Sequence, residues 1–255
     1  MLRVRVIPCL LLKQGGLVKT VRFRSPAYIG DPINTVRIFN ELEVDELAFL
    51  DITATVEDRA PDFDMLQQIA DECFMPLSYG GGVRDVRTAE RILQIGFEKL
   101  ILNSAPFDSP QLITDLARRF GSQAIIVSID VTKNLLSGYR VASHSATQVR
   151  ALRPVAWARE VERLGAGEIL LTSVEREGTW QGFDVPLTAS VSEAVGIPVI
   201  AHGGAGSIEH IGEAVRSGGA SAVALGSLVV YQSKGMGVLV NFPDKSSLTR
   251  ALTKV

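Results

Sequence analysis

The 255-residue chain has little of what anchors a protein outside the cytoplasm or within a membrane. Its two cysteines, Cys9 and Cys73, are too few for a disulfide framework, so we expect a reducing, cytoplasmic environment. No apolar run approaches the ~18–20 residues that a transmembrane helix needs. The apolar stretch at residues 6–12 contains a proline and is followed by Lys13, which favours a buried strand over a secretion signal. Secretion and membrane insertion are therefore set aside.

Net charge and metal-ligating residues are also scarce. Lys and Arg (26) nearly balance Asp and Glu (28), so nucleic-acid binding through bulk charge is not expected. The 3 histidines, His144, His202 and His210, show no metal-ligand spacing, and we expect neither a metal nor a cofactor. A GxSxG elbow and a P-loop lysine motif are both missing, which argues against serine hydrolase and nucleoside triphosphatase chemistry.

What the chain does contain is a regular alternation of short apolar runs and amphipathic stretches. Continuous apolar runs are typical of parallel strands buried on both faces. Eight strand–helix units in about 250 residues predict a single (β/α)₈ TIM barrel over residues 1–255, with a doubly wound sheet as the alternative. The expected strands cover residues 4–10, 46–51, 76–79, 99–103, 124–130, 168–173, 198–201 and 222–226. The expected helices cover residues 31–43, 62–73, 86–93, 110–120, 154–164, 186–195 and 208–217.

An internal repeat divides the expected barrel into halves, at about residues 1–122 and 123–245. The segment PLSYGGGVR at 76–84 is echoed by PVIAHGGAG at 198–206, and ELAFLD at 46–51 by EILLTS at 168–173, each 122 positions later. These matching landmarks predict approximate twofold symmetry, with related sites from both halves on one face.

The repeated landmarks fall at the carboxyl ends of strands, where such barrels place their active sites. A glycine turn exposes backbone N–H groups that can bind a phosphate beside a serine hydroxyl, although glycines also form plain tight turns. Two such sites would hold a ligand with a phosphate at each end. The candidate residues are Gly81, Gly82, Asn103 and Ser104 in the first half, and Gly203, Gly204, Gly226 and Ser227 in the second.

Three charged side chains could contact that ligand. Asp51 and Asp130 end strands and should point into the barrel mouth, where each could be a general base, a hydroxyl ligand or a helix N-cap. Lys19, in the loop expected after the first strand, could close over a phosphate or be an ordinary exposed lysine.

The opposite end of the barrel carries a different charge pattern. Two cations and two anions open four of the strands and should form a ring at the bottom: Arg5, Glu46, Lys99 and Glu168. Such a ring could stabilise the barrel or gate a central passage, and the spacing alone does not decide.

Several segments together resemble the HisF family, the cyclase subunits of imidazole glycerol phosphate synthase. They are IPCL (7–10), GDP (30–32), DELAFLDITA (45–54), GGG (80–82), FGSQ (120–123), GAGEILLTS (165–173) and GGAG (203–206). The resemblance implies a half-repeated barrel that binds a bis-phosphorylated ribonucleotide. It also implies a HisH-like glutaminase partner, whose ammonia enters through the bottom of the barrel.

The resemblance assigns roles to individual positions. It implies phosphate binding by Gly82, Ser104, Gly178, Gly204 and Ser227, and places Glu177 where the family usually has aspartate. It makes Asp130 one of two catalytic carboxylates and the bottom ring an ammonia gate. It also makes Glu98 a contact to the glutaminase.

Leu11 is the main departure from the family. The family pattern there is Cys-Leu-Asp-x-Lys, whereas residues 9–13 read CLLLK, so Leu11 replaces the other catalytic aspartate. Leucine cannot transfer a proton, and losing a positioned acid–base group costs about 10²–10⁴-fold in rate. The segments HSATQ (144–148) and GVLVNFP (237–243) also differ from the family's substrate loop and tail.

An intact gate with an altered cyclase site leads to two functional hypotheses. The chain is similar to a HisF-like branch associated with sugar amidation in surface polysaccharide biosynthesis. There the barrel accepts glutaminase-derived ammonia, and a separate amidotransferase installs it on a nucleotide-linked sugar. The alternative is an active cyclase, which makes imidazole glycerol phosphate and the ribonucleotide AICAR. In that case a carboxylate such as Asp51 would substitute for the catalytic aspartate that Leu11 replaces. Both hypotheses predict a phosphorylated small-molecule ligand and a heterodimer through the bottom face.

Overall fold

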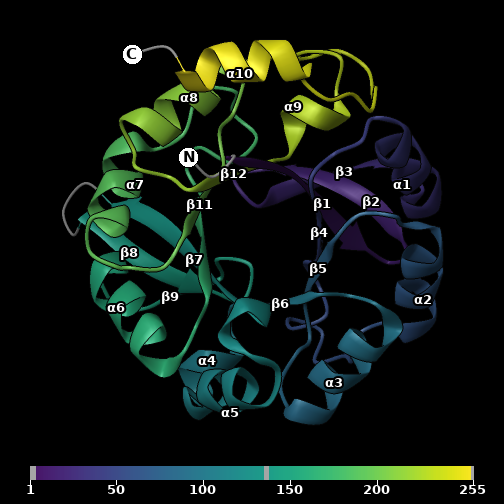
Figure 1. The fold of residues 1–255 in the computed structure, drawn as a ribbon. Coiled ribbons are helices and arrows are strands. Elements are labelled where there is room, and N and C mark those ends of the chain that lie inside the picture. The colour runs from purple at the N-terminus through teal and green to yellow at the C-terminus, as the bar shows by residue number, and fades with distance from the viewer. Residues whose placement is uncertain (1–3, 135–137, 254–255) are drawn as a thin grey trace.

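A closed parallel barrel forms the centre of the molecule (Figure 1). The computed structural model describes residues 4–134 and 138–253. In chain order the barrel strands are β1 (Arg5–Lys13), β4 (Leu47–Asp51), β5 (Leu77–Gly80), β6 (Lys99–Leu102), β7 (Ile125–Asn134), β10 (Glu168–Ser173), β11 (Val199–His202) and β12 (Ala222–Leu225). Each pairs in parallel with its neighbours, and the pairing of β7 with β10 closes the ring. The predicted (β/α)₈ barrel is therefore confirmed, and the doubly wound alternative, which needs an open sheet, is wrong.

Helices surround this ring on the outside (Figure 1). The long ones are α1 (Pro32–Glu41), α2 (Phe63–Glu72), α3 (Val86–Ile95), α5 (Gln111–Phe120), α6 (Pro154–Leu164), α7 (Val185–Ser192) and α8 (Ile208–Arg216). Each matches an expected helix to within a few residues. Asp31 caps α1 as expected, because its side chain accepts the N–H of Asn34 and proline occupies the first helical position.

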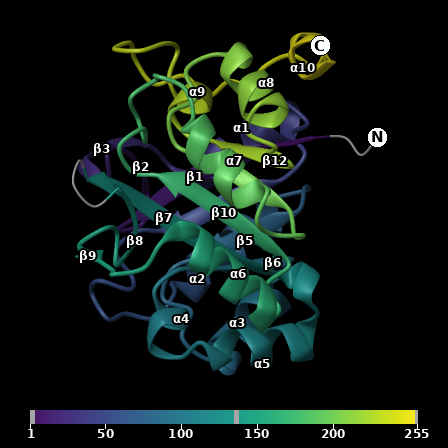
Figure 2. The same ribbon diagram turned by 90° about the vertical axis from the view of Figure 1, so that its left-hand side faces the viewer.

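Two hairpins extend the barrel beyond the expected strands. β1 continues past residue 10 and folds back into β2 (Gly16–Val21) and β3 (Arg24–Gly30). β7 likewise continues past residue 130 and folds back into β8 (Gly138–Ser143) and β9 (Gln148–Val149). Both hairpins lie at the same end of the barrel, on the left in Figure 2. The β1–β2 hairpin replaces the loop that was expected to carry Lys19.

Several short elements and a C-terminal helix were also not expected. They are α4 (Ala105–Asp108), a 3₁₀ turn η1 (Ser122–Ala124), α9 (Ser227–Val230) and α10 (Lys245–Thr253). α10 lies against α8 (Figure 1), where the Arg216 guanidinium donates to the Ala251 carbonyl.

The barrel strands are buried on both faces, as their continuous apolar sequences predict. Their outer side chains pack with the helices in one large core. The interior is a smaller cluster, formed by Ile7, Cys9, Ala48, Ile101, Ile126, Leu170, Ile200, Ala222 and Ala224. Within the described ranges, no helix is both long enough and apolar enough to cross a bilayer. The interior cluster separates two polar ends of the barrel. The candidate functional residues lie at both of these ends.

Candidate functional site

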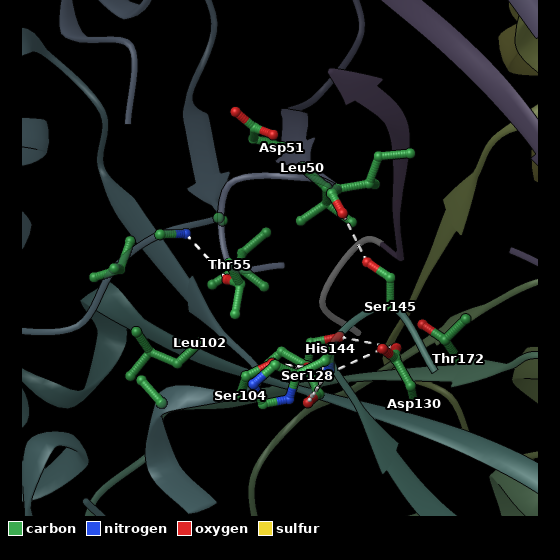
Figure 3. A pocket seen from close by; sticks show the side chains of 18 of the residues that line it. Leu50, Asp51, Thr55, Leu102, Ser104, Ser128, Asp130, His144, Ser145 and Thr172 are labelled. Carbon is green, nitrogen blue, oxygen red and sulfur yellow. Dashed lines mark hydrogen bonds between the residues drawn. The ribbon is translucent and has the colours of Figure 1, made fainter. Parts of the chain in front are cut away.

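A cavity of about 420 Å³ opens at the carboxyl ends of the barrel strands. Its apolar wall includes Leu11, Phe23, Leu50, Ile101 and Leu102. Its polar lining includes Thr20, Asn103, Ser104, Ser128, Asp130 and Thr172, several of which gather on one side in Figure 3. The cavity therefore has the mixed lining that is typical of a small-molecule site.

Asp130 is the buried carboxylate of this cavity. Burial raises its pKa to about 7, although hydrogen bonds from neighbouring side chains oppose the shift. Asn103 donates to one carboxylate oxygen at 3.1 Å, and the Ser128 hydroxyl donates to the other at 3.4 Å. A carboxyl group with a pKa near neutrality can both take and return a proton at physiological pH.

Leu11 lies on the wall of the same cavity but on the opposite side of the barrel from Asp130. Their strands, β1 and β7, stand four places apart in the ring of eight. Leu11 is buried, and it pairs with Val18 of β2 and Leu50 of β4. The strand geometry thus places an apolar side chain where a second acid–base group would face Asp130 across the cavity.

The first half's glycine turn borders the open cavity. Gly81 and Gly82 have positive φ angles of 125° and 68°, and a Cβ on Gly82 would lie 2.8 Å from the Arg59 carbonyl oxygen. The Gly82 N–H donates to the Thr55 hydroxyl at 3.3 Å. Both residues therefore require glycine, and the turn faces free volume.

Ser104 completes that side of the cavity. Its hydroxyl donates to the Asn103 side-chain oxygen at 3.0 Å and accepts the His144 backbone N–H at 3.0 Å. Because Asn103 also donates to Asp130, these contacts form a continuous chain from the His144 backbone N–H through Ser104 and Asn103 to the buried carboxylate. A ligand bound at Ser104 would be linked to the protonation of Asp130.

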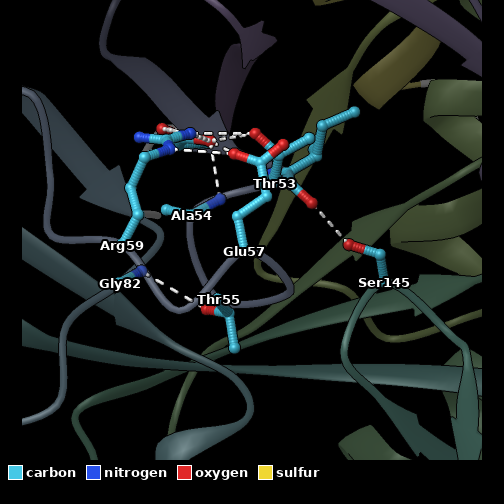
Figure 4. A network of polar contacts seen from close by, with 9 residues as sticks. Thr53, Ala54, Thr55, Glu57, Arg59, Gly82 and Ser145 are labelled. Atoms are coloured by element: carbon cyan, nitrogen blue, oxygen red, sulfur yellow. Dashed lines mark hydrogen bonds and ion pairs between the residues drawn. The ribbon is translucent and has the colours of Figure 1, made fainter.

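Asp51 also borders the cavity, but its carboxylate is engaged by its own loop, whose residues Thr53, Ala54 and Arg59 are labelled in Figure 4. It accepts the backbone N–H groups of Thr53 and Ala54 at 3.1 and 3.0 Å. Both of its oxygens also accept from the Arg59 guanidinium, at 3.0 and 2.9 Å. In Figure 3 it lies well away from Asp130. The carboxylate thus stabilises the loop after β4 and does not cap a helix there.

The second half's glycine turn is present but has almost no free space. The volume there is about 10 Å³, bordered by Gly178, His202, Gly203, Gly204, Gly226 and Ser227. The Lys19 side chain fills it: a Cβ built on Gly226 would lie 2.8 Å from the Lys19 Cε atom. Lys19 is only 7% exposed and forms an ion pair with Glu177, which is 2% exposed. The ordinary exposed lysine considered from the sequence is therefore wrong.

His202 lies between the open cavity and this closed turn. Its Nδ1 atom is 3.1 Å from the Thr172 hydroxyl. Burial and the nearby Lys19 cation lower the pKa of His202 to about 4, so the imidazole is neutral at pH 7. Beneath it, burial raises the pKa of the Cys9 thiol to about 12, which keeps it protonated. At pH 7 His202 and Cys9 are therefore both uncharged.

The charged ring at the bottom of the barrel forms as predicted. Arg5 bridges the two acids, at 2.7 Å to Glu46 and 2.6 Å to Glu168. Lys99 bridges them again, at 3.3 and 2.9 Å. Glu98, the expected partner contact, is exposed beside Lys99. One Glu46 oxygen (Oε1) is buried without a hydrogen-bond partner. The four side chains therefore form a continuous ring of ion pairs in which one carboxylate oxygen has no hydrogen bond.

Several lining residues were not predicted. Thr20, Phe23 and Arg84 border the cavity because of the β2–β3 hairpin and the turn after β5. Ser128 and Thr172 had a sequence signal, since each is a polar residue next to an apolar run of its strand. Within the described part of the chain, no three His, Cys, Asp or Glu side chains are grouped as a metal site would need.

Comparison with known proteins identifies the family. A family model described as histidine biosynthesis protein matches residues 5–234. The chain belongs to this family. A Pseudomonas aeruginosa PAO1 protein with the provisional name imidazole glycerol phosphate synthase subunit hisF2 is 46% identical over 248 residues, 97% of this chain and 99% of that protein.

Two further relatives cover almost the same length. A Leptospira borgpetersenii protein with the provisional name imidazole glycerol phosphate synthase subunit HisF is 44% identical over 252 residues, 97% of this chain and 99% of its own. The imidazole glycerol phosphate synthase subunit HisF of Alkaliphilus metalliredigens is 42% identical over 231 residues, 91% of this chain and 92% of its own. The chain is thus a HisF-like member of the histidine biosynthesis protein family. In this HisF-like barrel, the charged ring and Asp130 coexist with Leu11 and a filled second glycine turn.

Proposed function

We propose that this barrel is the synthase-type subunit of a glutamine-dependent amidotransferase complex. It accepts ammonia from a HisH-like glutaminase at the bottom face, near Glu98, and delivers it to the cavity at the top. The observation that carries the proposal is the closed ring of Arg5, Glu46, Lys99 and Glu168 beneath the barrel interior. The relatives' names, which describe synthase subunits, support it.

The barrel interior suits ammonia as cargo. Between the ring and the cavity lie apolar and small side chains, among them Cys9, Ala48, Ala222 and Ala224. An apolar interior favours the neutral molecule, because burying an unpaired ammonium ion is costly. The ring therefore acts as the entrance, where a neutral ammonia molecule must displace Lys99 or Arg5 to pass.

The cavity chemistry favours ammonia supply over ring closure. Cyclisation needs proton transfers on both sides of the substrate, and across the barrel from Asp130 the cavity wall presents Leu11, which cannot transfer a proton. We infer that a separate amidotransferase consumes the ammonia, and that its acceptor is a nucleotide-linked sugar. The support for this acceptor is the resemblance of the CLLLK segment (9–13) to the HisF-like branch associated with sugar amidation.

An active cyclase is the second candidate, favoured by the buried Asp130 carboxyl with a pKa near 7. An active cyclase requires another acid–base group to substitute for the aspartate that Leu11 replaces. Asp51 is poorly placed for this, because Arg59 and two backbone N–H groups already occupy its carboxylate. The geometry therefore favours the first candidate.

A Leu11→Asp variant separates the two candidates. With the family's bis-phosphorylated ribonucleotide and a high ammonium concentration, we expect the variant to form imidazole glycerol phosphate about 10²–10⁴-fold faster than the wild type, because it restores the second acid–base group. Chromatography of the product measures both rates, and Leu11→Asn is the matched control without a carboxylate. Robust turnover by the wild type would establish the cyclase instead.

A Lys99→Ala variant tests the ring as a gate. We expect the ratio of glutamine-driven to ammonium-driven product formation in the reconstituted complex to change severalfold, because one cation of the ring is lost. The assay uses whichever protein, wild type or Leu11→Asp, forms product. An unchanged ratio would assign the ring to stability alone.

A further inference from the structure

Exposed apolar side chains gather at the cavity end of the barrel. Scattered apolar residues are normal on a protein surface, but a group of them on one face marks a contact site. Among the large apolar side chains that are exposed in residues 4–134 and 138–253, only Ile38, on α1, and Phe74, before β5, lie elsewhere. The others, which we call the apolar rim, lie on segments that follow the carboxyl ends of strands: Val21, Tyr28, Val56, Val149, Met236, Val238 and Leu239.

Most segments that carry the apolar rim also line the cavity. The β2–β3 hairpin, the loop after β4 and the β8–β9 hairpin each contribute both rim residues and lining residues. Val56, for example, directly follows Thr55, which borders the cavity and is the counterpart of Glu177 in the internal repeat. The rim therefore borders the opening of the cavity from both halves of the barrel, and a protein seated on it would cover that opening.

The remaining rim segment, residues 232–240, is a loop whose shape is fixed by hydrogen bonds. Figure 2 shows it projecting on the left, at the same end as the hairpins. The Leu239 N–H donates to the Val230 carbonyl at 3.0 Å, and the Asn241 side chain donates to the Leu239 carbonyl at 2.8 Å. Met236 and Leu239 are nevertheless each 52% exposed. A fixed loop that presents apolar side chains to water loses little conformational freedom when a partner binds, which suits a contact surface.

The hairpin and the loop that carry most of the rim are also basic. Residues 14–30 and 231–243 contain no Asp or Glu. Arg22, Arg24 and Lys234, which lie within these two segments, are exposed. Positive charge around an apolar surface attracts a partner whose own contact surface is edged with carboxylates.

The two exposed acids beside Val56 are already paired with arginines. Glu57 pairs with Arg59 at 3.0 Å, and Asp58, whose side chain is 84% exposed, pairs with Arg84. Exposed ion pairs of this kind are weak, so these arginines can turn toward carboxylates of a docked protein at little cost. The rim therefore keeps its basic character where the chain also has acids.

The cargo of the proposed function requires a cover over this opening. Ammonia that escapes into water at pH 7 is mostly protonated, and an ammonium ion has no lone pair with which to attack an acceptor. The glutaminase is expected at the charged ring, which is at the other end of the barrel and carries none of the rim. A second protein is therefore needed at the cavity end.

We propose that the apolar rim is the docking surface of the separate enzyme that consumes the ammonia. That enzyme presents apolar side chains edged with carboxylates to the rim and covers the cavity, so that ammonia passes to it without meeting bulk water. The inference rests on the proposed function in taking ammonia as the cargo. It places the barrel between two partners, with the glutaminase at the charged ring and the consuming enzyme at the rim.

Photo-crosslinking in the native cells identifies the protein that sits on the rim. The full chain carries the substitution Val238→p-benzoylphenylalanine, and mass spectrometry identifies the adduct. We expect an amidotransferase that has no glutaminase domain of its own and so depends on supplied ammonia. The same substitution at Ile38, which is exposed on the side of the barrel, is the matched control and should not give this adduct. An adduct with a second copy of this chain, or any result without such an amidotransferase, overturns the proposal.

Calorimetric titration with that enzyme, once purified, measures the contribution of the rim. Leu239→Asp and Tyr28→Asp should each weaken binding about tenfold or more, because a charge enters an apolar contact. Arg24→Glu should weaken binding more at low salt than at high salt, because its effect is electrostatic. Ile38→Asp is the control and should leave the affinity unchanged. Wild-type affinity in both rim variants, with wild-type unfolding temperatures, contradicts docking at the rim.

Product formation by barrel, glutaminase and consuming enzyme together separates this inference from the proposed function. The ratio of glutamine-driven to ammonium-driven amidation should fall about tenfold in Leu239→Asp and stay constant in Ile38→Asp. A wild type in which glutamine drives no amidation would overturn the proposed function, and the docking result would still stand on the titrations. Glutamine-driven amidation that is equal in wild type and Leu239→Asp would overturn the rim inference alone.

Discussion

The two halves of the barrel mouth have the same glycine turns and hairpins but differ in the side chains that occupy the space beside each turn. Each half's glycine turn is covered by the hairpin of the other half. His144, after β8, donates to Ser104 in the first half, and Lys19 of β2 reaches Glu177 in the second. The first turn faces about 420 Å³ of cavity, and the second about 10 Å³. The repeat thus preserves the loops, while single side chains decide how much free volume each loop borders.

Breaking the closed half should have the largest effect on stability. Lys19→Met leaves the Glu177 carboxylate buried without its cation, and removing one member of a buried ion pair costs about 3–5 kcal/mol. Urea unfolding followed by circular dichroism measures the loss. Arg84→Met is the control from the open half, where the ion pair is exposed and the expected change is below about 1 kcal/mol. Equal losses would show that the two halves are held together in the same way.

Two of the buried titratable groups of the mouth, Asp130 and His202, should respond oppositely to pH. Asp130 has an unfolded pKa near 3.8 and a folded pKa of about 7, so the folded protein binds the extra proton between these values. This group therefore makes stability fall as pH rises from about 4 to 7, by on the order of 3 kcal/mol. His202, with its pKa lowered from 6.5 to about 4, makes stability rise over much of the same range.

An Asp130→Asn variant isolates the first of these contributions. We expect its unfolding free energy to match the wild type near pH 4 and to exceed it increasingly up to pH 7, because the burial cost of the carboxylate is gone. Urea unfolding at several pH values gives the difference. A difference that does not vary with pH would mean that Asp130 titrates alike in the folded and unfolded chain.

A smaller effect should distinguish the glycines themselves. Gly82 and Gly204 are repeat counterparts with φ angles of 68° and 109°. An added Cβ would lie 2.8 Å from the Arg59 carbonyl oxygen in the first case and 2.2 Å from the Gly182 carbonyl oxygen in the second. Alanine should destabilise both, by about 1–3 kcal/mol, and Gly204→Ala more than Gly82→Ala. Thermal unfolding measures both, and the reverse order would place the tighter packing in the open half.

The sequence predicted the barrel well because its strands are buried on both faces. Continuous apolar runs located all eight, and the first residues of four of the strand–helix units predicted the charged ring. The hairpins were missed because their outer strands, β3 and β9, are mostly exposed and lack the apolar runs that mark the barrel strands. The closure of the second turn could not be predicted, since it depends on Lys19 and Glu177 meeting across 158 positions.

The crossed hairpins bear on how such a barrel could arise by duplication. The strand registers pair Leu11 with Val18 and Asp130 with Ala142, so the next residues, Lys19 and Ser143, hold matching places. Two fused copies of the first half would set Lys19 against Thr55, a buried cation without an anion. Two copies of the second would set Ser143 against Glu177, a buried anion without a cation. Once the two halves had diverged at Lys19, Thr55, Ser143 and Glu177, a barrel made of two copies of either half would contain an unpaired buried charge.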